Sequence, residues 1–526
     1  MANFPHEIGK RGVIAAGDRQ TAAAGARIFR EGGNAADAIV AAGMAAFVCE
    51  VALCGPLGGG VAVSQFGGDT PLAWDFFARV PGLGAKTKKP QDFGQAVIDF
   101  GVTQQAFRVG KGAAALGLAL PGLIELHASH GRLPLNIVVE PAVELGRKGF
   151  LVGEQMAYIL SLIEPIFRWT PETHGLCFPN GNCPEAGARL FNRALADVLE
   201  SVGRDTSLVN ALYTQLADEY GPSAGGLVTQ RDIDGLRIDC HKAIEFDWHN
   251  WRIASMPAPS SGGVLIGTGA RLIKDIGARV GAGSTEHMLE MANVQRLLLG
   301  VRSSSFDERI CSSEFVDGLL RAWDVDVLRK MGENVDFADN FLGSTTHMSA
   351  MDAELGTVSL TLTNGEGCGS NLSGTGIQVN NLLGEEDINP KGFHQADPGT
   401  RMNTMMAPTI ARSQTHRLAL GSGGSNRLRN AILSTLLNVI EFETSLETAV
   451  EMPRLHVDRS GDQIVAHIED VGDVKVLCES LRKRYDDVTI FPGRNMFFGG
   501  VHAVEWSADG PSGTGDLRRG GAVAFG

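Results

Sequence analysis

Two adjacent threonines, Thr345 and Thr346, stand where a polar, irregular segment gives way to an alternating one. The stretch LGSTTHMSAMDAELGTVSLTLTNGEGCGS runs from that segment into a pattern typical of strands. A threonine with a free α-amine carries a nucleophile and a base on one residue, because an α-amine has an ordinary pKa of about 7.7–8 and is partly neutral near pH 7. To free that amine inside a chain, the peptide bond before Thr345 must break.

The hydroxyl of Thr345 can break this bond by itself. It attacks the carbonyl of Ser344, the acyl group shifts from nitrogen to oxygen, and water cleaves the resulting ester. The small residues Gly343 and Ser344 allow that carbonyl to reach a strained geometry. Two threonines at the start of a strand are also ordinary strand formers, so the pair alone leaves both interpretations open.

A glycine pair in GSGGSN forms the second candidate for chemistry. The surrounding sequence RLALGSGGSNRLRNAILSTLLNVIEF predicts a strand, a turn at Gly423 and Gly424, and an apolar helix. Such a turn can direct adjacent backbone N–H groups at a developing oxyanion. A plain strand-to-helix turn or a phosphate loop fits the glycines as well, although the spacing and lysine of a P-loop are missing.

The elements that must position these residues are indicated by periodicity. Helical spacing predicts a helix that ends at Gly32 and Gly33, and a second one from Asn34 to about Ala52, followed by the strand VAVSQF. PGLIELHASHGRLPLNIVVEPAVELGRKGF predicts two further helices, and about 150 to 340 is expected to be mainly helical. From 345 to 363 the pattern predicts a β-hairpin, and the C-terminus a strand, a turn and a strand.

Length and composition limit the class of protein. The 526 residues, with 44% hydrophobic and 20% charged residues, indicate two domains or one large layered α/β unit. A net charge of −14 argues against nucleic acid or an anionic membrane as a partner. Neither a membrane-spanning run nor a signal peptide is seen, so a cytoplasmic location is expected.

The cysteines indicate free thiols. None of the eight cysteines forms a CxxC pair, and Cys177 and Cys183, with FPNGN between them, are the candidates for a disulfide or a metal site. Free thiols in a cytosolic protein fit the pattern better. The sequence gives no reason to require a metal or an organic cofactor.

Four blocks of sequence resemble the gamma-glutamyltransferase family of N-terminal-nucleophile hydrolases, in the same order and over nearly the whole chain. The first is REGGNAADAIVAAGMA with GPLGGG, the second LPGLIELHASHGRLPLNIVVEPAVELGRKGF, and the third TTHMSAMDAELGTVSLTLT. The fourth comprises RMNTMMAPTI, GSGGSNR and MPRLHVD. This resemblance implies an αββα sandwich built from two self-cleaved segments of one chain, residues 1–344 and 345–526, which form a heterodimer that is open to further oligomerisation.

The resemblance also implies roles for single residues. Thr345 is expected to be the processing residue and the mature nucleophile, with the cleavage site between Ser344 and Thr345. Thr363, on the return strand of the hairpin, matches the residue whose hydroxyl holds the nucleophile, and Gly423 and Gly424 match the oxyanion hole. Strand alternation agrees, since Thr345, His347, Ser349 and Met351 are expected on one face.

The substrate pocket departs from the family pattern. An ungapped count puts Lys86 where the family has a carboxylate-binding arginine, and lysine cannot form the bidentate pair. The family's serine pair becomes Thr404 and Met405, and its aspartate pair becomes Gly384 and Glu385. Glu385 can still meet an ammonium group.

One further departure follows the second threonine of the hairpin. The asparagine expected two residues after Thr363 is Gly365, with Asn364 beside it. The residues expected to bind substrate are therefore Lys86, Asn364, Glu385 and Thr404, in a reshaped pocket.

Three hypotheses follow. The first is a self-processing threonine amidohydrolase or acyltransferase that cleaves a gamma-glutamyl-type amide through an acyl-enzyme on Thr345 and transfers the acyl group to water or an amino acid. The second is a relative that acts on another acyl amide, such as an oxamate-like monoamide of a small dicarboxylic acid or a cephalosporin or glutaryl side chain. The third, from another class, is an unprocessed binding protein without catalysis.

Overall fold

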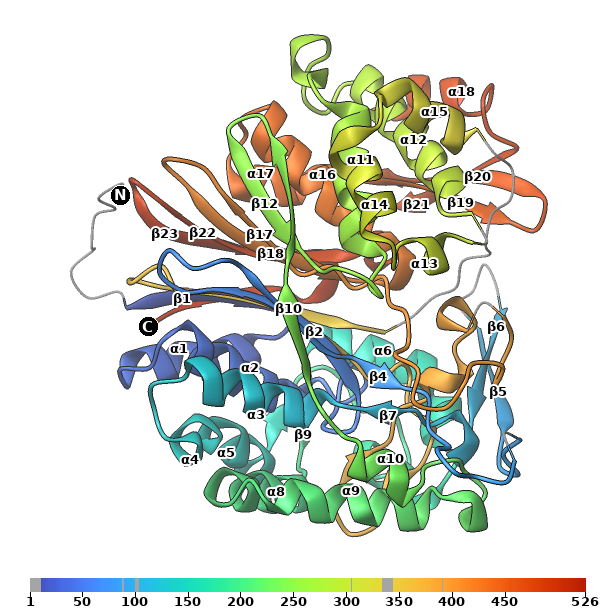
Figure 1. Cartoon of the computed structure of the whole chain (residues 1–526). Coiled ribbons are helices and arrows are strands. Elements are labelled where there is room, and N and C mark those ends of the chain that lie inside the picture. The colour runs from blue at the N-terminus through green and yellow to red at the C-terminus, as the bar shows by residue number, and fades with distance from the viewer. Residues whose placement is uncertain (1–10, 88, 100–103, 304, 334–343, 390) are drawn as a thin grey trace.

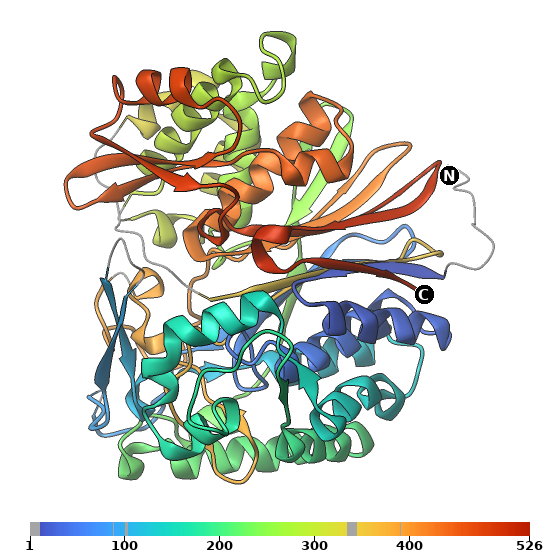
Figure 2. The same cartoon turned by 180° about the vertical axis from the view of Figure 1, so that it is seen from behind.

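The fold is a sandwich of four layers, with helices below, two stacked β-sheets in the middle and helices above (Figures 1 and 2). It is seen in a computed structural model, which describes residues 11–87, 89–99, 104–303, 305–333, 344–389 and 391–526. The expected αββα architecture is confirmed.

The lower sheet has seven strands in the order β10-β3-β2-β14-β13-β1-β24, with every neighbouring pair antiparallel. The predicted hairpin forms its centre. Strands from both ends of the chain flank that hairpin, so the sheet is built from both predicted segments. The strands are β1 (Gly12–Ala16), β2 (Gly59–Gln65), β3 (Leu72–Phe76), β10 (Asp239–Lys242), β13 (Thr346–Asp352), β14 (Thr357–Thr363) and β24 (Ala522–Phe525).

The upper sheet has six strands in the order β11-β12-β17-β18-β22-β23, again with antiparallel neighbours. Its strands are β11 (Ile244–Trp248), β12 (Trp251–Ser255), β17 (Thr409–Arg412), β18 (Arg417–Gly423), β22 (Gly500–Ser507) and β23 (Gly510–Gly515).

The lower helices cover the outer face of the seven-stranded sheet. Helix α2 (Ala35–Cys49) is the innermost of them. It is buried along its whole length, which explains its alanine-rich sequence. Asn34 caps it in a capping box with Asp37. The other helices of this half are α1 (Arg19–Arg30), α3 (Ala119–His130), α4 (Leu135–Val138), α5 (Glu140–Lys148), α6 (Glu154–Phe167), α7 (Pro171–Cys177), α8 (Arg193–Arg204), α9 (Leu208–Glu219) and α10 (Gln230–Asp234).

The upper helices cover the six-stranded sheet, with α11 and α16 packed against each other. They are α11 (Gly262–Ile273), α12 (Thr285–Val301), α13 (Phe306–Arg309), α14 (Ser313–Asp317), α15 (Val325–Gly332), α16 (Leu428–Glu441), α17 (Leu446–Glu451) and α18 (Lys475–Leu481). A small sheet of β19 (Leu455–Ser460), β20 (Gln463–Asp470) and β21 (Asp487–Pro492) lies beside them.

The remaining strands of the described structure form short pairs. They are β4 (Ala78–Arg79) with β7 (Leu116–Gly117), β5 (Gly94–Asp99) with β6 (Gln104–Val109), β8 (Phe150–Leu151) with β9 (Arg189–Leu190), and β15 (Asn371–Leu372) with β16 (Ile377–Gln378).

The central hairpin is buried on both faces. Met348 and Ala350 of β13 pack in the core that the lower helices share. His347 and Ser349 point the other way, because the ring of His347 lies against Gly421 of the upper sheet and the Ser349 hydroxyl donates to the carbonyl of His502 at 3.1 Å. The expected alternation along this strand is confirmed.

The elements predicted around the site are confirmed, and the region from about 150 to 340 is mainly helical, as expected. The first two helices, the strand after the glycine-rich loop, the hairpin, β18 with α16, and the C-terminal strands lie where the sequence predicted them. About 150 to 340 is not purely helical, since β10, β11 and β12 lie within it. These strands are short, so their sequences show too few alternations to be recognised.

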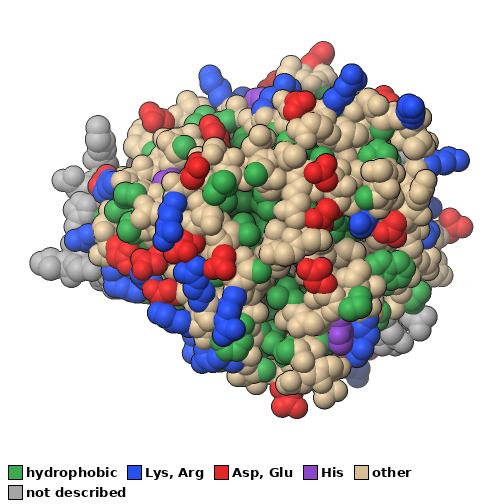
Figure 3. Space-filling model, turned by 90° about the horizontal axis from the view of Figure 1, so that it is seen from below, with side chains coloured by type: hydrophobic (Ala, Val, Ile, Leu, Met, Phe, Trp, Pro, Cys, Tyr) green, Lys and Arg blue, Asp and Glu red, His purple; other side chains and the backbone are tan. Residues whose placement is uncertain are grey.

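Charges on the lower face are paired rather than gathered by sign (Figure 3). Arg147 contacts Asp197 and Glu200, and Lys148 contacts Glu144. Among the described residues, no helix is both long enough and apolar enough to cross a membrane. The cysteines, Cys177 and Cys183 included, are free thiols.

Candidate active site

Thr345 lies immediately before β13, at the end of the central hairpin and between the two sheets. Its side chain is buried but borders a pocket. The residues that line this pocket are Phe77, Thr345, Thr363, Leu382, Glu385, Asp387, Ile388, Thr404, Met405, Met406, Ser425 and Leu428. Half of these residues are apolar, and the other half carry hydroxyl or carboxyl groups.

The second threonine of the pair anchors the strand. The Thr346 hydroxyl donates to Glu50 Oε2 at 2.5 Å, and the Thr21 hydroxyl donates to Glu50 Oε1 at 2.6 Å. Glu50 is fully buried, and burial together with the charge of Asp18 raises its pKa to about 7. Thr346 therefore ties the start of β13 to the end of α2, while Thr345 faces the pocket.

Thr363 contacts Ser344, the residue before Thr345. Its hydroxyl donates to the carbonyl oxygen of Ser344 at 2.5 Å, and the backbone N–H of Gly365 donates to the same hydroxyl oxygen at 3.1 Å. The sequence predicted that Thr363 would hold the nucleophile; in the uncut chain it holds the carbonyl that Thr345 would attack. A hydrogen bond to that oxygen polarises the carbonyl.

Glu366 contacts the other polar atom of the Ser344 backbone. The N–H of Ser344 donates to Glu366 Oε1 at 3.1 Å. Glu366 is buried, and its own N–H donates to Asn381 Oδ1 at 2.9 Å. Ser344 is thereby held at both its N–H and its carbonyl.

Three carboxyl groups gather beside the pocket: Glu366, Glu385 and Asp387. Burial raises the pKa of each of them, and the negative charge of Asp387 raises the pKa of Glu366 and Glu385 further. The Ser425 hydroxyl donates to Asp387 at 2.6 Å, which partly offsets the effect on Asp387. Within the described residues, these side chains do not belong to a metal-binding group of histidines, cysteines and acids.

A buried arginine lies behind the pocket wall on the side of α16. Arg429 is buried, and its Nη1 lies 3.9 Å from the sulfur of Met405, which lines the pocket. Its Nε and Nη2 have no hydrogen-bond partner among the described residues. Burial and the neighbouring Arg302 lower the pKa of Arg429 to about 9.

The turn at Gly423 and Gly424 begins against Thr345. Gly423 ends β18, and a Cβ at this position would lie 2.2 Å from the carbonyl oxygen of Thr345. Gly424 has a φ of +115°, and a Cβ there would lie 3.1 Å from Gly499 Cα. Gly423 can therefore lie this close to Thr345 only because it carries no side chain, while Gly424 supplies the left-handed backbone of the turn beside Gly499.

Two of the four residues expected to bind substrate line the pocket, namely Thr404 and Glu385. Lys86 does not: it is exposed, because the turns at Gly82 (φ +114°) and Gly84 (φ +76°) lead the chain outward. The N–H groups of Gly82 and Leu83 donate to the carboxylate of Asp232, which fixes this loop away from Thr345.

Asn364 also lies outside the pocket. It is buried, its amide nitrogen is 3.4 Å from the carbonyl of Gln378, and its Oδ1 faces the loop at Gly58. Substrate binding by Asn364 stays a prediction, and this side chain does not line the pocket. The reason is the turn after Thr363, which points this side chain at the loop before β2.

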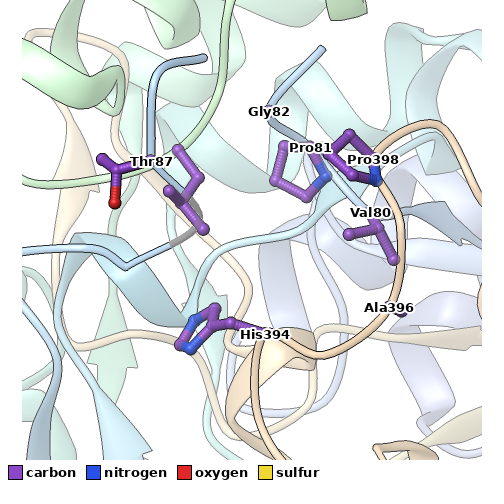
Figure 4. A pocket seen from close by; sticks show the side chains of 8 residues that line it. Val80, Pro81, Gly82, Thr87, His394, Ala396 and Pro398 are labelled. Carbon is purple, nitrogen blue, oxygen red and sulfur yellow. The ribbon is translucent and has the colours of Figure 1, made fainter. Parts of the chain in front are cut away.

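A second pocket lies near Lys86 but shares no lining residue with the first (Figure 4). It is lined by Val80, Pro81, Gly82, Thr87, Leu227, His394, Ala396 and Pro398. The Nε2 of His394 is bound to the carbonyl of Gly112 at 2.9 Å, and the wall is otherwise mainly apolar. It brings no nucleophile and base together.

Sequence reasoning missed several residues at Thr345, above all Glu366, Asp387 and Ser425. Glu366 stands in NGEG, where glycines on both sides suggested only a loop. A carboxylate between glycines just after a strand that holds a candidate hydroxyl is a signal that points to this position.

Comparison with known proteins agrees with this geometry. The profile of the family described as gamma-glutamyltranspeptidase matches residues 21–526. The chain is 27% identical to an acylase ACY 1 proenzyme of Pseudomonas, over 95% of this chain and 91% of that protein. It is 26% identical to the glutathione hydrolase proenzyme of Escherichia coli, over 85% of this chain and 81% of that protein.

The fold is shared with solved structures as well. A cephalosporin acylase from Bacillus halodurans superposes with a TM-score of 0.79 at 19% identity, covering 100% of this chain and 98% of that one. The gamma-glutamyltranspeptidase of Helicobacter pylori matches with a TM-score of 0.51 at 22% identity, over 63% of this chain and 93% of that one. The chain belongs to the gamma-glutamyltranspeptidase family and is an amide-cleaving enzyme with the N-terminal-nucleophile hydrolase fold.

Proposed function

We propose that the chain cleaves itself between Ser344 and Thr345 and that Thr345, with its α-amine freed, is the nucleophile of an amidohydrolase. The support is the position of this bond: the Ser344 carbonyl accepts from Thr363 at 2.5 Å, and Thr345 borders the pocket. Family relatives described as proenzymes agree with this proposal.

In the mature enzyme the α-amine of Thr345 takes the proton of its own hydroxyl, and the oxygen attacks the carbonyl carbon of the substrate amide. The N–H groups around Gly423 and Gly424 stabilise the oxyanion. The C–N bond breaks, the leaving amine takes the proton, and an ester on Thr345 remains. Water or an amino acid then attacks that ester and restores the hydroxyl.

The acyl group carries an ammonium, as in a gamma-glutamyl amide. The observation behind this proposal is the pair of carboxyl groups, Glu385 and Asp387, that lines the pocket with Thr345. Oε1 of Glu385 is buried and accepts no hydrogen bond from the described part of the chain. An ammonium group of the substrate supplies the missing donor and favours the ionised form of these acids.

A second candidate is an acyl group with a carboxylate and no ammonium, such as a glutaryl or oxamate amide. Two observations favour it. Met405 and its apolar neighbours replace polar groups on the pocket wall. Arg429, whose Nε and Nη2 have no hydrogen-bond partner among the described residues, lies behind Met405. The relatives described as acylases fit this candidate.

Cleavage is tested on the purified chain. We expect two fragments on a denaturing gel, residues 1–344 and 345–526, the second beginning TTHMSAM. Thr345→Ala is expected to stay intact because no hydroxyl remains to start the shift. A wild-type chain that stays whole after long incubation, or a Thr345→Ala chain that is cut at the same bond, contradicts the proposal.

The acyl group is tested by comparing gamma-glutamyl, glutaryl and oxamate amides on the cleaved enzyme. Glu385→Gln is expected to raise KM for the gamma-glutamyl amide roughly ten- to hundredfold, the effect of losing a charged hydrogen bond. Lys86→Ala is the control, since Lys86 is exposed outside the pocket. A preference for glutaryl or oxamate amide with Glu385→Gln unchanged selects the second candidate.

A further inference from the structure

We infer that Glu366 is a positioning residue for the self-cleavage, and that it holds the Ser344 amide so that the neighbouring carbonyl stays in place for attack by Thr345. The inference rests on the proposed cleavage of the Ser344–Thr345 bond. Its basis is the pair of contacts to Ser344: the N–H donates to Glu366 at 3.1 Å, and the carbonyl accepts from Thr363 at 2.5 Å.

The two contacts come from the last residue of β14 and from the tight loop that follows it. Gly365 has a φ of +59°, so the loop turns back after Thr363 and presents Thr363 and Glu366 to the same residue. The loop is fixed from outside as well. The N–H of Asn364 donates to the carbonyl of Leu53 at 3.0 Å, and the N–H of Glu366 donates to Asn381.

Glu366 is buried, and the donors around its carboxyl in the described part of the chain include the Ser344 N–H and the Asn381 side chain. It is only 2% exposed, and its Oε2 accepts no hydrogen bond from the described residues. A buried carboxyl with one satisfied oxygen is costly to the fold. The Ser344 N–H, at 3.1 Å, is therefore one contact that helps to account for an acid at this position.

The contact matters for the bond that breaks. When the Thr345 oxygen bonds to the carbonyl carbon of Ser344, that carbon becomes tetrahedral and the C–N bond to Thr345 lengthens and breaks. The Thr345 nitrogen takes the proton that the hydroxyl gives up, and water then cleaves the ester. Only a Ser344 that cannot rotate keeps its carbonyl between Thr345 and the Thr363 hydroxyl, because one contact alone leaves the backbone free to turn.

The test follows cleavage of the full chain as it is made, by pulse-labelled translation in vitro and a denaturing gel. Glu366→Ala is expected to slow cleavage roughly ten- to hundredfold, the effect of losing a hydrogen bond to an acid group. Glu366→Gln keeps an accepting oxygen at the same distance and is expected to cleave within about threefold of wild type. Glu366→Asp, one methylene shorter, is expected to be slow although it keeps the charge.

Glu386→Ala is the matched control, because it removes the same carboxyl group without touching Ser344. Glu386 is exposed on the same segment as Glu385. Each variant is also made with Thr345→Ala, and its thermal unfolding midpoint shows whether the fold is kept. If Glu366→Ala does not fold, the cleavage rates of Glu366→Gln and Glu366→Asp decide. A Glu366→Asp chain that cleaves as fast as the Glu366→Gln chain overturns the inference.

The outcomes separate this inference from the proposed function. Glu366→Ala cleaving at the wild-type rate, or Glu366→Gln as slow as Glu366→Ala, overturns the positioning role while leaving Thr345 as the nucleophile. An uncut wild-type chain, or cleavage in the Thr345→Ala chain, removes the proposed function itself.

Discussion

At the scale of single residues, Thr363 has one role before the proposed cleavage and another after it. Its hydroxyl donates to the Ser344 carbonyl at 2.5 Å, with its oxygen held by the N–H of Gly365. In the proposed self-cleavage, that arrangement supplies a hydrogen-bond donor to the oxyanion that forms on the Ser344 carbonyl. Once Ser344 has left, the same hydroxyl is free to meet Thr345, which is the role that the sequence predicted.

We therefore expect Thr363→Val, which keeps the shape and removes the hydroxyl, to slow self-cleavage by roughly 10²–10³, the usual effect of losing one oxyanion donor. Thr363→Ser keeps the donor and should cleave within a few-fold of wild type. A gel time course of both variants measures this. Equal rates for Val and Ser would show that the hydroxyl does not act on the Ser344 carbonyl.

The raised pKa of Glu50 predicts that the free energy of unfolding depends on pH. Its pKa is raised from 4.5 to about 7, so between these values the folded chain binds more protons than the unfolded chain and the free energy of unfolding falls as pH rises. Glu50→Gln does not titrate, so its stability relative to the unsubstituted chain is expected to rise by about 3 kcal/mol across this range.

The comparison uses urea unfolding at pH 4.5 to 8, with both chains carrying Thr345→Ala so that neither is cut. Glu386→Gln, an exposed carboxylate, is the control and should show a constant difference. A constant difference for Glu50→Gln as well would mean that Glu50 is ionised in the fold throughout.

At the scale of elements, the loop after β14 depends on one glycine. Gly365 has a φ of +59°, and a Cβ there would lie 2.1 Å from both Asn381 Oδ1 and Glu385 Oε1. Gly374 has a similar φ of +71° but nothing within 4 Å of its Cβ position. The two sites separate backbone strain from crowding.

In the Thr345→Ala chain, Gly374→Ala is expected to lower the free energy of unfolding by about 1–2 kcal/mol, the cost of a left-handed backbone at a residue with a Cβ. Gly365→Ala should cost about 1–3 kcal/mol more, because the loop must also shift. Without Thr345→Ala, it should slow cleavage too. Equal losses of stability at the two sites would contradict the crowding seen at Gly365.

The sequence predicted elements whose signals are local and missed contacts that are made at a distance. The cap at Asn34 and the alternation of the hairpin act within a few residues, and both are confirmed. The place of Lys86 depends on Asp232, which is far away in sequence and anchors its loop. Glu366 likewise acquires its place through Asn381, a contact that no periodicity indicates.

At the scale of the whole molecule, the proposed cut falls inside one continuous sheet. β13 and β14 follow the proposed cut, and they lie between β1 and β2, which precede it. Gly12 of β1 pairs with Asp352 of β13, and Gln65 of β2 pairs with Thr357 of β14. The upper sheet is mixed in the same way, since β12 pairs with β17. Neither segment holds a complete core without the other.

We therefore expect the two fragments to stay together after cleavage. Size-exclusion chromatography should give the same elution volume for the cut wild-type chain and the uncut Thr345→Ala chain, while a denaturing gel separates a 182-residue fragment. The fragments should part only when denaturant unfolds both, because separation exposes the central strands of two sheets along with the apolar side chains on both of their faces. Fragments that elute separately in native buffer would show that the strand ladders do not hold the segments together.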